Sequence, residues 1–347
     1  MGDSFLSAFK KHHQKNIKHY FLSFKDETSE GLIYAQQFKI GGRQIKGYQK
    51  KNNVRKRVNS FLMALFNFKI IGFGNNFLTN EPSASIEGKI KNPDLFLKEL
   101  IKKLSKEECV NKFIFPDHFF KTLGIKSPEE KFPELIALEV DEDMSIDIRP
   151  HWKSMEDYTK DLSKKYRKRI KSVFAKSEKL EFKPLNKEDL KNNQEKMQSL
   201  FNNVRKSSAF YSVPFNVGSY SDFQKIDNPK SITYGCYLED ELIAFCSEWF
   251  AKNNLYSYFI GLDYKYSRTH NVYDRILYNT IENGIKNGVE TIVFGRTAAE
   301  FKSNFGATPK KSFIFIYLKN PVLRYFLKPI LSFIKPKKWI QRNPFKV

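Results

Sequence analysis

The stretch FGRTAAEFKSNFGA, residues 294–307, decides how the second half of this 347-residue chain is expected to fold. A short strand is predicted at Thr291–Phe294, where the stretch begins. A short helix is predicted at residues 298–305, and a final strand at residues 312–318. The stretch is therefore interpreted as the connection between two strands of a mixed α/β domain.

The elements before this stretch follow a regular order. Three consecutive strands are predicted at residues 232–238, 242–250 and 255–262, and the dipeptides between them favour hairpin turns. A helix is predicted at residues 272–286, where apolar residues recur on one side and Asn287-Gly288 offers a left-handed cap. This order predicts a mixed, mainly antiparallel sheet flanked by helices.

Two more helices and a strand are expected at the start of this domain. A capping box that begins at Ser154 predicts a helix running to about Lys179. A short strand at residues 180–185 and a helix at residues 187–206 follow.

The first half of the chain has a similar but less regular pattern. A helix with Asn92 as its cap is predicted at residues 93–104. Among the other elements expected there are a helix at residues 54–66 and strands at residues 32–38, 68–73, 136–140 and 145–148. We therefore divide the chain into a first domain at residues 1–150, a second at residues 151–318, and a tail at residues 319–347.

Composition narrows the classes of partner. The chain has 60 Lys and Arg against 38 Asp and Glu, a net charge of +22, which attracts nucleic acid, anionic lipid, an acidic carrier protein or a phosphorylated cofactor. Its three cysteines form no CxxC pair and its six histidines have no ligand spacing, so we expect neither a disulfide framework nor a metal site. A signal region and a charge-free apolar stretch of spanning length are not seen, so we expect a cytoplasmic protein.

Four segments resemble one known group of enzymes. The helix start Asp157–Arg169, with its LSKKYRKR run, the strand end FIGLDY at residues 259–264, the helix at residues 272–288 and the closing FGR…K…FGA segment occur in the order found in FemAB-like and BioF2-like acyltransferases. These are N-acyltransferases of the GNAT type. The resemblance implies two GNAT-like domains in tandem, of which the first is degenerate.

The resemblance also implies an activity. Such enzymes move an acyl or aminoacyl group from an activated donor to an amine of a bacterial cell-envelope or lipid-linked acceptor. The donor is acyl-CoA, an acyl-carrier protein or aminoacyl-tRNA. GNAT enzymes that use acyl-CoA usually carry a glycine-rich loop before the donor-side helix, whereas residues 267–271 here contain no glycine. The donor therefore stays open.

Four residues are candidates for a direct role in transfer. Arg296 follows a strand and is suited to bind a phosphate or carboxylate, or else to pair with Glu300. Glu248 is a candidate general base if it does not point to solvent. Asp263 is suited to orient an amine or to cap a turn, and Tyr258 is either a general acid or a packing residue.

The candidates for substrate or donor binding surround these residues. Arg268 and His270 precede the donor-side helix, where they would meet donor phosphates, although a histidine near a turn is more often an ordinary surface residue. Lys302 is either a substrate contact or a solvated lysine. The other candidates are Tyr273, Gly295, Thr297, and Tyr211 in an aromatic loop that either lines the acceptor site or is simply packed.

Two basic segments support a second interpretation. Seven Lys and Arg residues lie between Lys160 and Lys171 on one helix face, which is either solvated or in contact with tRNA or lipid phosphates. The tail has eight Lys and Arg and no acid, interleaved with apolar residues at helical spacing. It is expected to lie in the plane of an anionic membrane, on the inner face of the cell membrane, or to dock on the protein. A catalytically silent adaptor that binds RNA or membrane is the alternative function.

Overall fold

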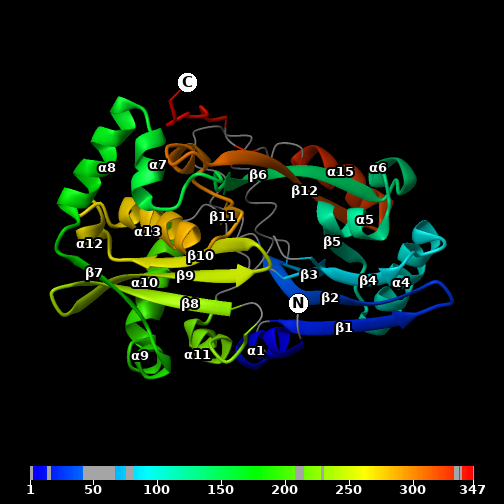
Figure 1. Ribbon diagram of the computed structural model, residues 1–347. Helices are drawn as coiled ribbons and strands as arrows, with labels where there is room; N and C mark the ends of the chain where they lie inside the picture. The colour runs from blue at the N-terminus through cyan, green and yellow to red at the C-terminus, as the bar shows by residue number, and fades with distance from the viewer. Residues whose placement is uncertain are drawn as a thin grey trace.

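A twelve-stranded sheet runs through the computed structural model of the chain (Figure 1). The structure describes residues 3–13, 17–41, 67–75, 82–207, 215–227, 230–331, 336 and 338–346. The helix predicted at residues 54–66 and the candidate Tyr211 lie outside these residues.

The elements alternate along both halves. Those of the first half are α1 (Asp3–His13), β1 (Lys18–Lys25), β2 (Ser29–Gly41), β3 (Asn67–Phe73), β4 (Ala84–Gly88), α4 (Pro93–Glu108), β5 (Lys112–Pro116), α5 (Asp117–Leu123), α6 (Pro128–Lys131) and β6 (Leu135–Asp147). Those of the second half are α7 (Met155–Asp161), α8 (Lys164–Lys176), β7 (Leu180–Pro184), α9 (Lys187–Asn192), α10 (Gln194–Ser207), η2 (Val217–Ser219), α11 (Tyr220–Phe223), β8 (Lys230–Leu238), β9 (Glu241–Ala251), β10 (Asn254–Leu262), α12 (Tyr264–Ser267), α13 (Val272–Lys286), β11 (Thr291–Gly295), α14 (Ala299–Ser303), β12 (Thr308–Leu318) and α15 (Pro321–Leu331).

The two halves exchange their closing strands. The sheet order is β1-β2-β3-β5-β12-β6-β11-β10-β9-β8-β7, with β4 paired to β2. The last strand of the first half, β6, thus lies beside β11 of the second, and the last strand of the second half, β12, lies beside β5 of the first. The two exchanged strands also pair with each other, from Leu135 opposite Tyr317 to Ser145 opposite Thr308. The expected boundary at residue 150 falls between β6 and α7, while the sheet continues across it.

Parallel strands separate at two places in this sheet. β10 and β11 pair only over three residues of each, Asn254–Tyr256 with Thr291–Val293. β3 and β5 pair only at Ile71 with Phe113 and Gly72 with Ile114. The remaining neighbours are antiparallel, so the predicted mixed, mainly antiparallel sheet is confirmed for the second half.

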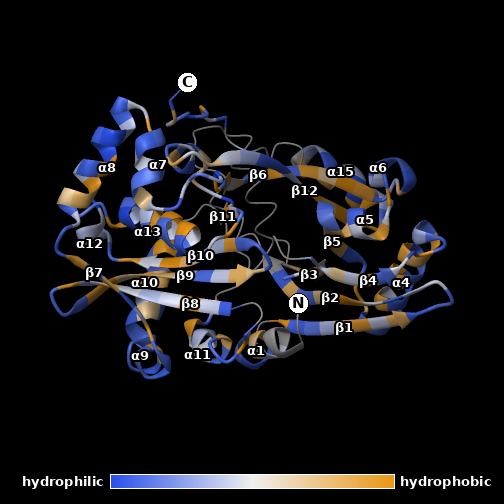
Figure 2. Cartoon of the chain, in the orientation of Figure 1, coloured by the Kyte–Doolittle hydropathy of each residue, from blue (hydrophilic) through white to orange (hydrophobic). Residues whose placement is uncertain are grey.

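Helices cover both faces of the second half. α7, α8 and α13 pack together over β9–β11, and their buried side chains form one core with Ile292 and Phe294. α10, α11 and α1 cover the other face, where Phe215, Tyr220 and Trp249 are buried. Most of α8 is coloured hydrophilic in Figure 2, as its run of lysines and arginines predicts.

Several local predictions are confirmed by the caps. Asn92 accepts a hydrogen bond from the Leu95 amide, Ser154 accepts one from the Asp157 amide, and Gly288 after α13 has a φ of +64°. The strands predicted at residues 136–140 and 145–148 are one continuous strand, β6. The helix predicted at residues 187–206 is two helices, because Asn186 begins α9 with a capping box and α10 starts after Asn193.

The long helix predicted from Ser154 to Lys179 is also wrong in one respect. It breaks into α7 and α8 because Leu162 forms a β-bridge with Phe345, and the Ser163 amide donates to the Pro344 carbonyl. The C-terminal residues 338–346 thus run across the second half as an extended strap. The Trp339 indole donates to Glu142, and the Phe345 ring packs against Trp152.

Candidate active site

The separation of β10 and β11 places the end of β11 at the centre of the candidate site. Beyond Val293, β11 follows β6 instead of β10, with a register shift before Gly295. Phe294, Gly295 and Arg296 therefore diverge from Ser257 and Tyr258 on β10. The resemblance to GNAT-type acyltransferases implies that a donor and an acceptor meet where two such parallel strands separate.

The turn that follows β11 is strained and firmly held. Gly295, Thr297 and Ala298 have φ values of +74°, +71° and +52°, and a positive φ is unfavourable for a β-branched residue such as threonine. Lys302 Nζ donates to the carbonyl oxygens of Phe294, Gly295 and Arg296 at 2.8, 3.0 and 2.9 Å. The ammonium of Lys302 thus satisfies three carbonyls and fixes the direction in which Arg296 leaves the strand.

Lys302 is therefore not the solvated lysine that the sequence left open. Its side chain is 5% exposed, and burial lowers its pKa to about 7, against the opposing field of Asp143 on β6. The helix α14 that carries it is joined to the donor-side helix α13 through stacked rings of Phe301 and Tyr273, 5.1 Å apart. Burial also raises the pKa of the Tyr273 hydroxyl.

Arg296 is half-buried at the junction of the two halves. Its guanidinium acts electrostatically on His118, the second residue of α5 in the first half. The partner that the sequence suggested for it, Glu300, instead pairs with Arg342 of the C-terminal strap. The strap thus forms the ion pair with the Glu300 carboxylate of α14.

Glu248 lies beneath α13 and does not point to solvent. It is 1% exposed, and its Oε2 accepts a hydrogen bond of 3.0 Å from the Asn283 amide of α13. Burial raises its pKa to about 7, which the polar side chains of Thr280 and Asn283 oppose. Glu248 is thus buried between β9 and α13 and is held by Asn283.

Tyr258 lies on the opposite face of the sheet, in an aromatic cluster. The register of β9 and β10 shifts between Ser257 and Ile260, and this irregularity places the Tyr258 ring edge-on to Trp249 and close to Phe259. Its hydroxyl is buried without a hydrogen-bond partner among the described residues, and burial raises its pKa well above the usual value.

The candidates before α13 form a separate group at its N-terminus. Asp263 caps α12 by accepting from the Lys265 amide at 2.9 Å, which is the turn-capping role that the sequence left open. Arg268 is exposed, and His270 Nδ1 lies 2.9 Å from the Thr269 hydroxyl. The structure thus brings Gly295, Arg296, Thr297 and Lys302 together and leaves Asp263, Arg268 and His270 at the far end of β10.

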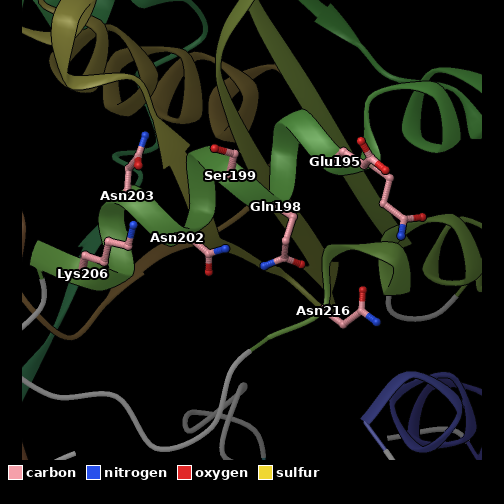
Figure 3. A pocket seen from close by; sticks show the side chains of 8 residues that line it. Glu195, Gln198, Ser199, Asn202, Asn203, Lys206 and Asn216 are labelled. Carbon is pink, nitrogen blue, oxygen red and sulfur yellow. The ribbon is translucent and has the colours of Figure 1, made fainter.

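Two hollows lie near these elements but outside the turn. One, of about 530 Å³, is lined by polar side chains of α10 and by Asn216 (Figure 3). The other, of about 330 Å³, lies between α8 and α14 and is lined by Lys165, Tyr166, Arg169, Glu300, Asn304 and Arg342. Neither contains Arg296, Phe259 or Asp263. In the second hollow Arg169 pairs with Asp274 at 2.8 Å, and its guanidinium lies over the rings of Phe301 and Phe305.

Sequence reasoning missed two residues that the structure brings to the turn. Asp143 acts on Lys302, and His118 lies near Arg296. His118 follows strand β5 much as Thr297 follows β11, so the shared pattern of the two halves was the signal that could have found it.

Within the described residues, no group of three His, Cys, Asp or Glu side chains could hold a metal ion. Cys236 and Cys246 are buried with raised thiol pKa values.

Known proteins share parts of this architecture. The family described as Acetyltransferase (GNAT) domain matches residues 231–303, which run from β8 to α14 and include the turn and Lys302. Over those residues the chain is similar to the GNAT domain of acetyltransferases. No curated protein sequence matches the chain. A search of solved structures, however, finds neighbours that extend over both halves.

Three such structures share the fold. A structure of FemX is 11% identical with a TM-score of 0.50, and the match covers 93% of each chain. L-PGS from Bacillus licheniformis is 12% identical with a TM-score of 0.50, covering 94% of this chain and 95% of that one. A conserved protein from Bacteroides thetaiotaomicron is 12% identical with a TM-score of 0.51, covering 91% and 90%. The resemblance to FemAB-like GNAT proteins, and the fold it implies, are confirmed.

None of the described helices is long and apolar enough to cross a bilayer.

Proposed function

We propose that this GNAT-type protein transfers an acyl or aminoacyl group from an activated donor to an amine of a cell-envelope or lipid-linked acceptor. The observation that carries the proposal is the turn at residues 294–298. It is strained, it is held by a buried lysine, and it lies where β10 and β11 separate. Backbone strain of this kind persists where the surrounding structure fixes it, and it is concentrated at functional sites.

In this proposal the protein acts mainly by holding the two reactants. The Arg296 guanidinium, fixed by the turn, binds a phosphate or carboxylate of one reactant through paired N–H groups. The acceptor amine then attacks the donor carbonyl between β10 and the turn. Such positioning supplies a large part of the rate of an acyl transfer without a covalent intermediate. The Lys302 ammonium keeps the carbonyls of residues 294–296 turned away from the reacting atoms.

The donor is the least constrained part of the proposal. Arg268 and His270 stand before α13, where the N-terminal N–H groups favour anions. The phosphates of acyl-CoA or of an acyl-carrier protein would fit there. The basic face of α8 and the hollow lined by Lys165 and Arg169 would instead suit the phosphates of aminoacyl-tRNA. The structural neighbour FemX and L-PGS give no more than the fold, so both donor classes enter the test.

The test combines a donor panel with variants of one residue. The purified protein is incubated with acyl-CoA, acyl-carrier protein or aminoacyl-tRNA and with amine acceptors, and products are identified by mass spectrometry. We expect Arg296→Ala to lose most activity and Arg296→Lys to retain part of it, because lysine keeps the charge but not the paired N–H groups. Thermal unfolding of both variants should match the parent. Full activity in Arg296→Ala would remove Arg296 from the site.

We further propose that α15 holds the protein to an anionic membrane, at the inner face of the cell membrane, where a lipid-linked acceptor would be reached. One side of α15 packs Leu327 and Leu331 on β6 and β12. The other side leaves Val322, Tyr325 and Phe326 exposed by 63%, 77% and 62%. α15 and the two residues before it carry Lys319, Arg324 and Lys328 and no acid, so this helix is basic as well as apolar.

Vesicle sedimentation tests this surface. We expect the protein to bind vesicles that contain phosphatidylglycerol more tightly than pure phosphatidylcholine vesicles. Replacement of Tyr325 and Phe326 by Asp should abolish the difference, whereas Leu95→Asp, at an exposed leucine of α4, should not. Unchanged binding in the Tyr325→Asp, Phe326→Asp variant would refute the surface. Leu327 is unsuitable for the test because its burial means that Asp would disrupt the fold.

A catalytically silent adaptor is the second candidate. Two observations favour it: α8 presents a basic, hydrophilic face, and neither hollow reaches Arg296. It predicts no product with any donor, together with salt-dependent RNA binding that is lost when Lys164, Lys168 and Lys171 are replaced by Gln. Product formation with any donor would exclude it.

A further inference from the structure

The strand exchange directs the ends of β5 and β11 toward each other. β5 is antiparallel to β12, β12 to β6, and β6 to β11. β5 and β11 therefore run in opposite directions, with β12 and β6 between them. β5 ends at Pro116 opposite Ile314, and β11 ends at Gly295 opposite Met144, whose partner on β12 is Pro309. Those two positions on β12 are about 16 Å apart along the strand. The residues that follow each strand enter this interval from opposite sides.

His118 enters it from the first half, and Arg296 from the second. The Nε2 atom of His118 is buried without a hydrogen-bond partner in the part of the chain that the structure describes. A buried polar atom that lacks a partner is costly to fold. A bound reactant that reaches this atom would supply the missing partner.

The surroundings keep the imidazole neutral. Burial lowers the pKa of His118, the nearby Arg296 and Lys121 lower it further, and Asp117 opposes them. α5 packs against β4, β5 and β12. The charged residues of those strands, Glu87, Lys112, Lys310 and Lys311, are not among the groups that shift this pKa. A neutral imidazole has one nitrogen able to accept a proton.

We propose that His118 Nε2 is the proton acceptor for the attacking amine, so that the first half of the chain supplies the base for the second half's site. The proposal rests on the acyl transfer proposed above. The amine nitrogen forms a bond to the donor carbonyl carbon and gives one proton to His118. The carbon–sulfur or carbon–oxygen bond of the donor breaks, and the imidazolium returns that proton to the leaving thiolate or ribose oxygen. Asp117 stabilises the imidazolium while it exists.

The experiment measures pH–rate profiles of the full chain with the donor and acceptor found in the panel. His118→Gln keeps the size and polarity of the side chain but cannot accept a proton at neutral pH. His151→Gln is the matched control, because His151 lies on the surface and pairs with Asp161. We expect His118→Gln to lower kcat by about 100-fold or more, the usual range for a lost general base, and to leave KM within a few-fold.

The shape of the profile separates a base from a structural residue. The parent and His151→Gln should gain activity with pH through a pKa below 6.5 and then level off, and this rise should be absent in His118→Gln. In His118→Ala, added imidazole should restore activity. If His118→Gln keeps kcat within twofold and the same profile, His118 is not the base, although the proposed transfer stands. If the parent makes no product with any donor, the proposed transfer itself fails, and this inference with it.

Discussion

Replacing the buried Glu248 by Gln should make the protein more stable at neutral and alkaline pH. Glu248 is 1% exposed beneath α13, and burial raises its pKa from an ordinary 4.5 to about 7. The folded state therefore holds a proton on this carboxyl between these pH values, whereas the unfolded chain releases it. Because folding takes up a proton there, stability falls as the pH rises from about 4.5 to about 7.

The size of the effect follows from the shift. Each pKa unit corresponds to about 1.4 kcal/mol, so the ionised carboxyl costs the folded state about 3 kcal/mol at pH 8 and about 1 kcal/mol at pH 5. Gln has nearly the same shape, carries no charge and retains an oxygen for the Asn283 amide. We therefore expect Glu248→Gln to gain about 3 kcal/mol at pH 8 and much less at pH 5.

Urea denaturation at the two pH values measures this difference. Glu195→Gln, at an exposed position of α10, is the control and should change neither value. A Glu248→Gln variant that is equally stable at both pH values, or less stable at pH 8, would refute the reasoning. An activity assay on the same variant adds a second reading. Loss of transfer without a gain in stability would assign Glu248 the general-base role suggested by the sequence.

Three further predictions concern the turn and the strap. Phe345→Ala should lower the free energy of unfolding by about 2 kcal/mol in urea denaturation, since its ring packs on Trp152 and Tyr158; an unchanged value would mean that the strap is not docked in solution. Gly306→Ala should also lower the free energy of unfolding, because Gly306 has a φ of +92° and a new Cβ would lie 2.4 Å from the Phe345 ring. The loss should be smaller when Phe345 is already replaced by Ala. If the losses of the two single variants simply add in the double variant, the contact is contradicted. The parent protein should become more stable between pH 7 and pH 10, because Lys302, with its lowered pKa, releases a proton on folding in this range. Lys302→Met should remove this rise in urea denaturation. The same rise in both proteins would contradict the prediction.

Local patterns predicted many of the elements well. The hairpin turns, the caps at Ser154 and Asn92 and the left-handed Gly288 are set by a few neighbouring residues, so their positions can be read from the sequence. Where local preference and distant contact disagree, the sequence misleads. The apolar period of residues 154–179 is continuous, yet the helix breaks at Leu162 because Phe345 pairs with it.

The candidate site was predicted only in part for the same reason. Arg296 and Lys302 belong to one short segment whose residue types point to a strand end and a helix. The role of Lys302 depends on three backbone carbonyls, and side-chain spacing does not encode their direction. His118 reaches Arg296 through the order of strands in the sheet. Such long-range pairing has no local signature, so the contribution of the first half could not be seen in advance.

The exchanged strands also have a consequence for synthesis on the ribosome. β5 emerges early, but the strand that covers its outer edge, β12, is made near the end of the chain. Until then β5 presents unpaired backbone groups in a half-built sheet, and exposed edges of this kind invite pairing with other chains. We therefore expect a chain stopped after residue 150 to aggregate in cells, and nascent chains to engage chaperones until residue 318 has left the exit tunnel.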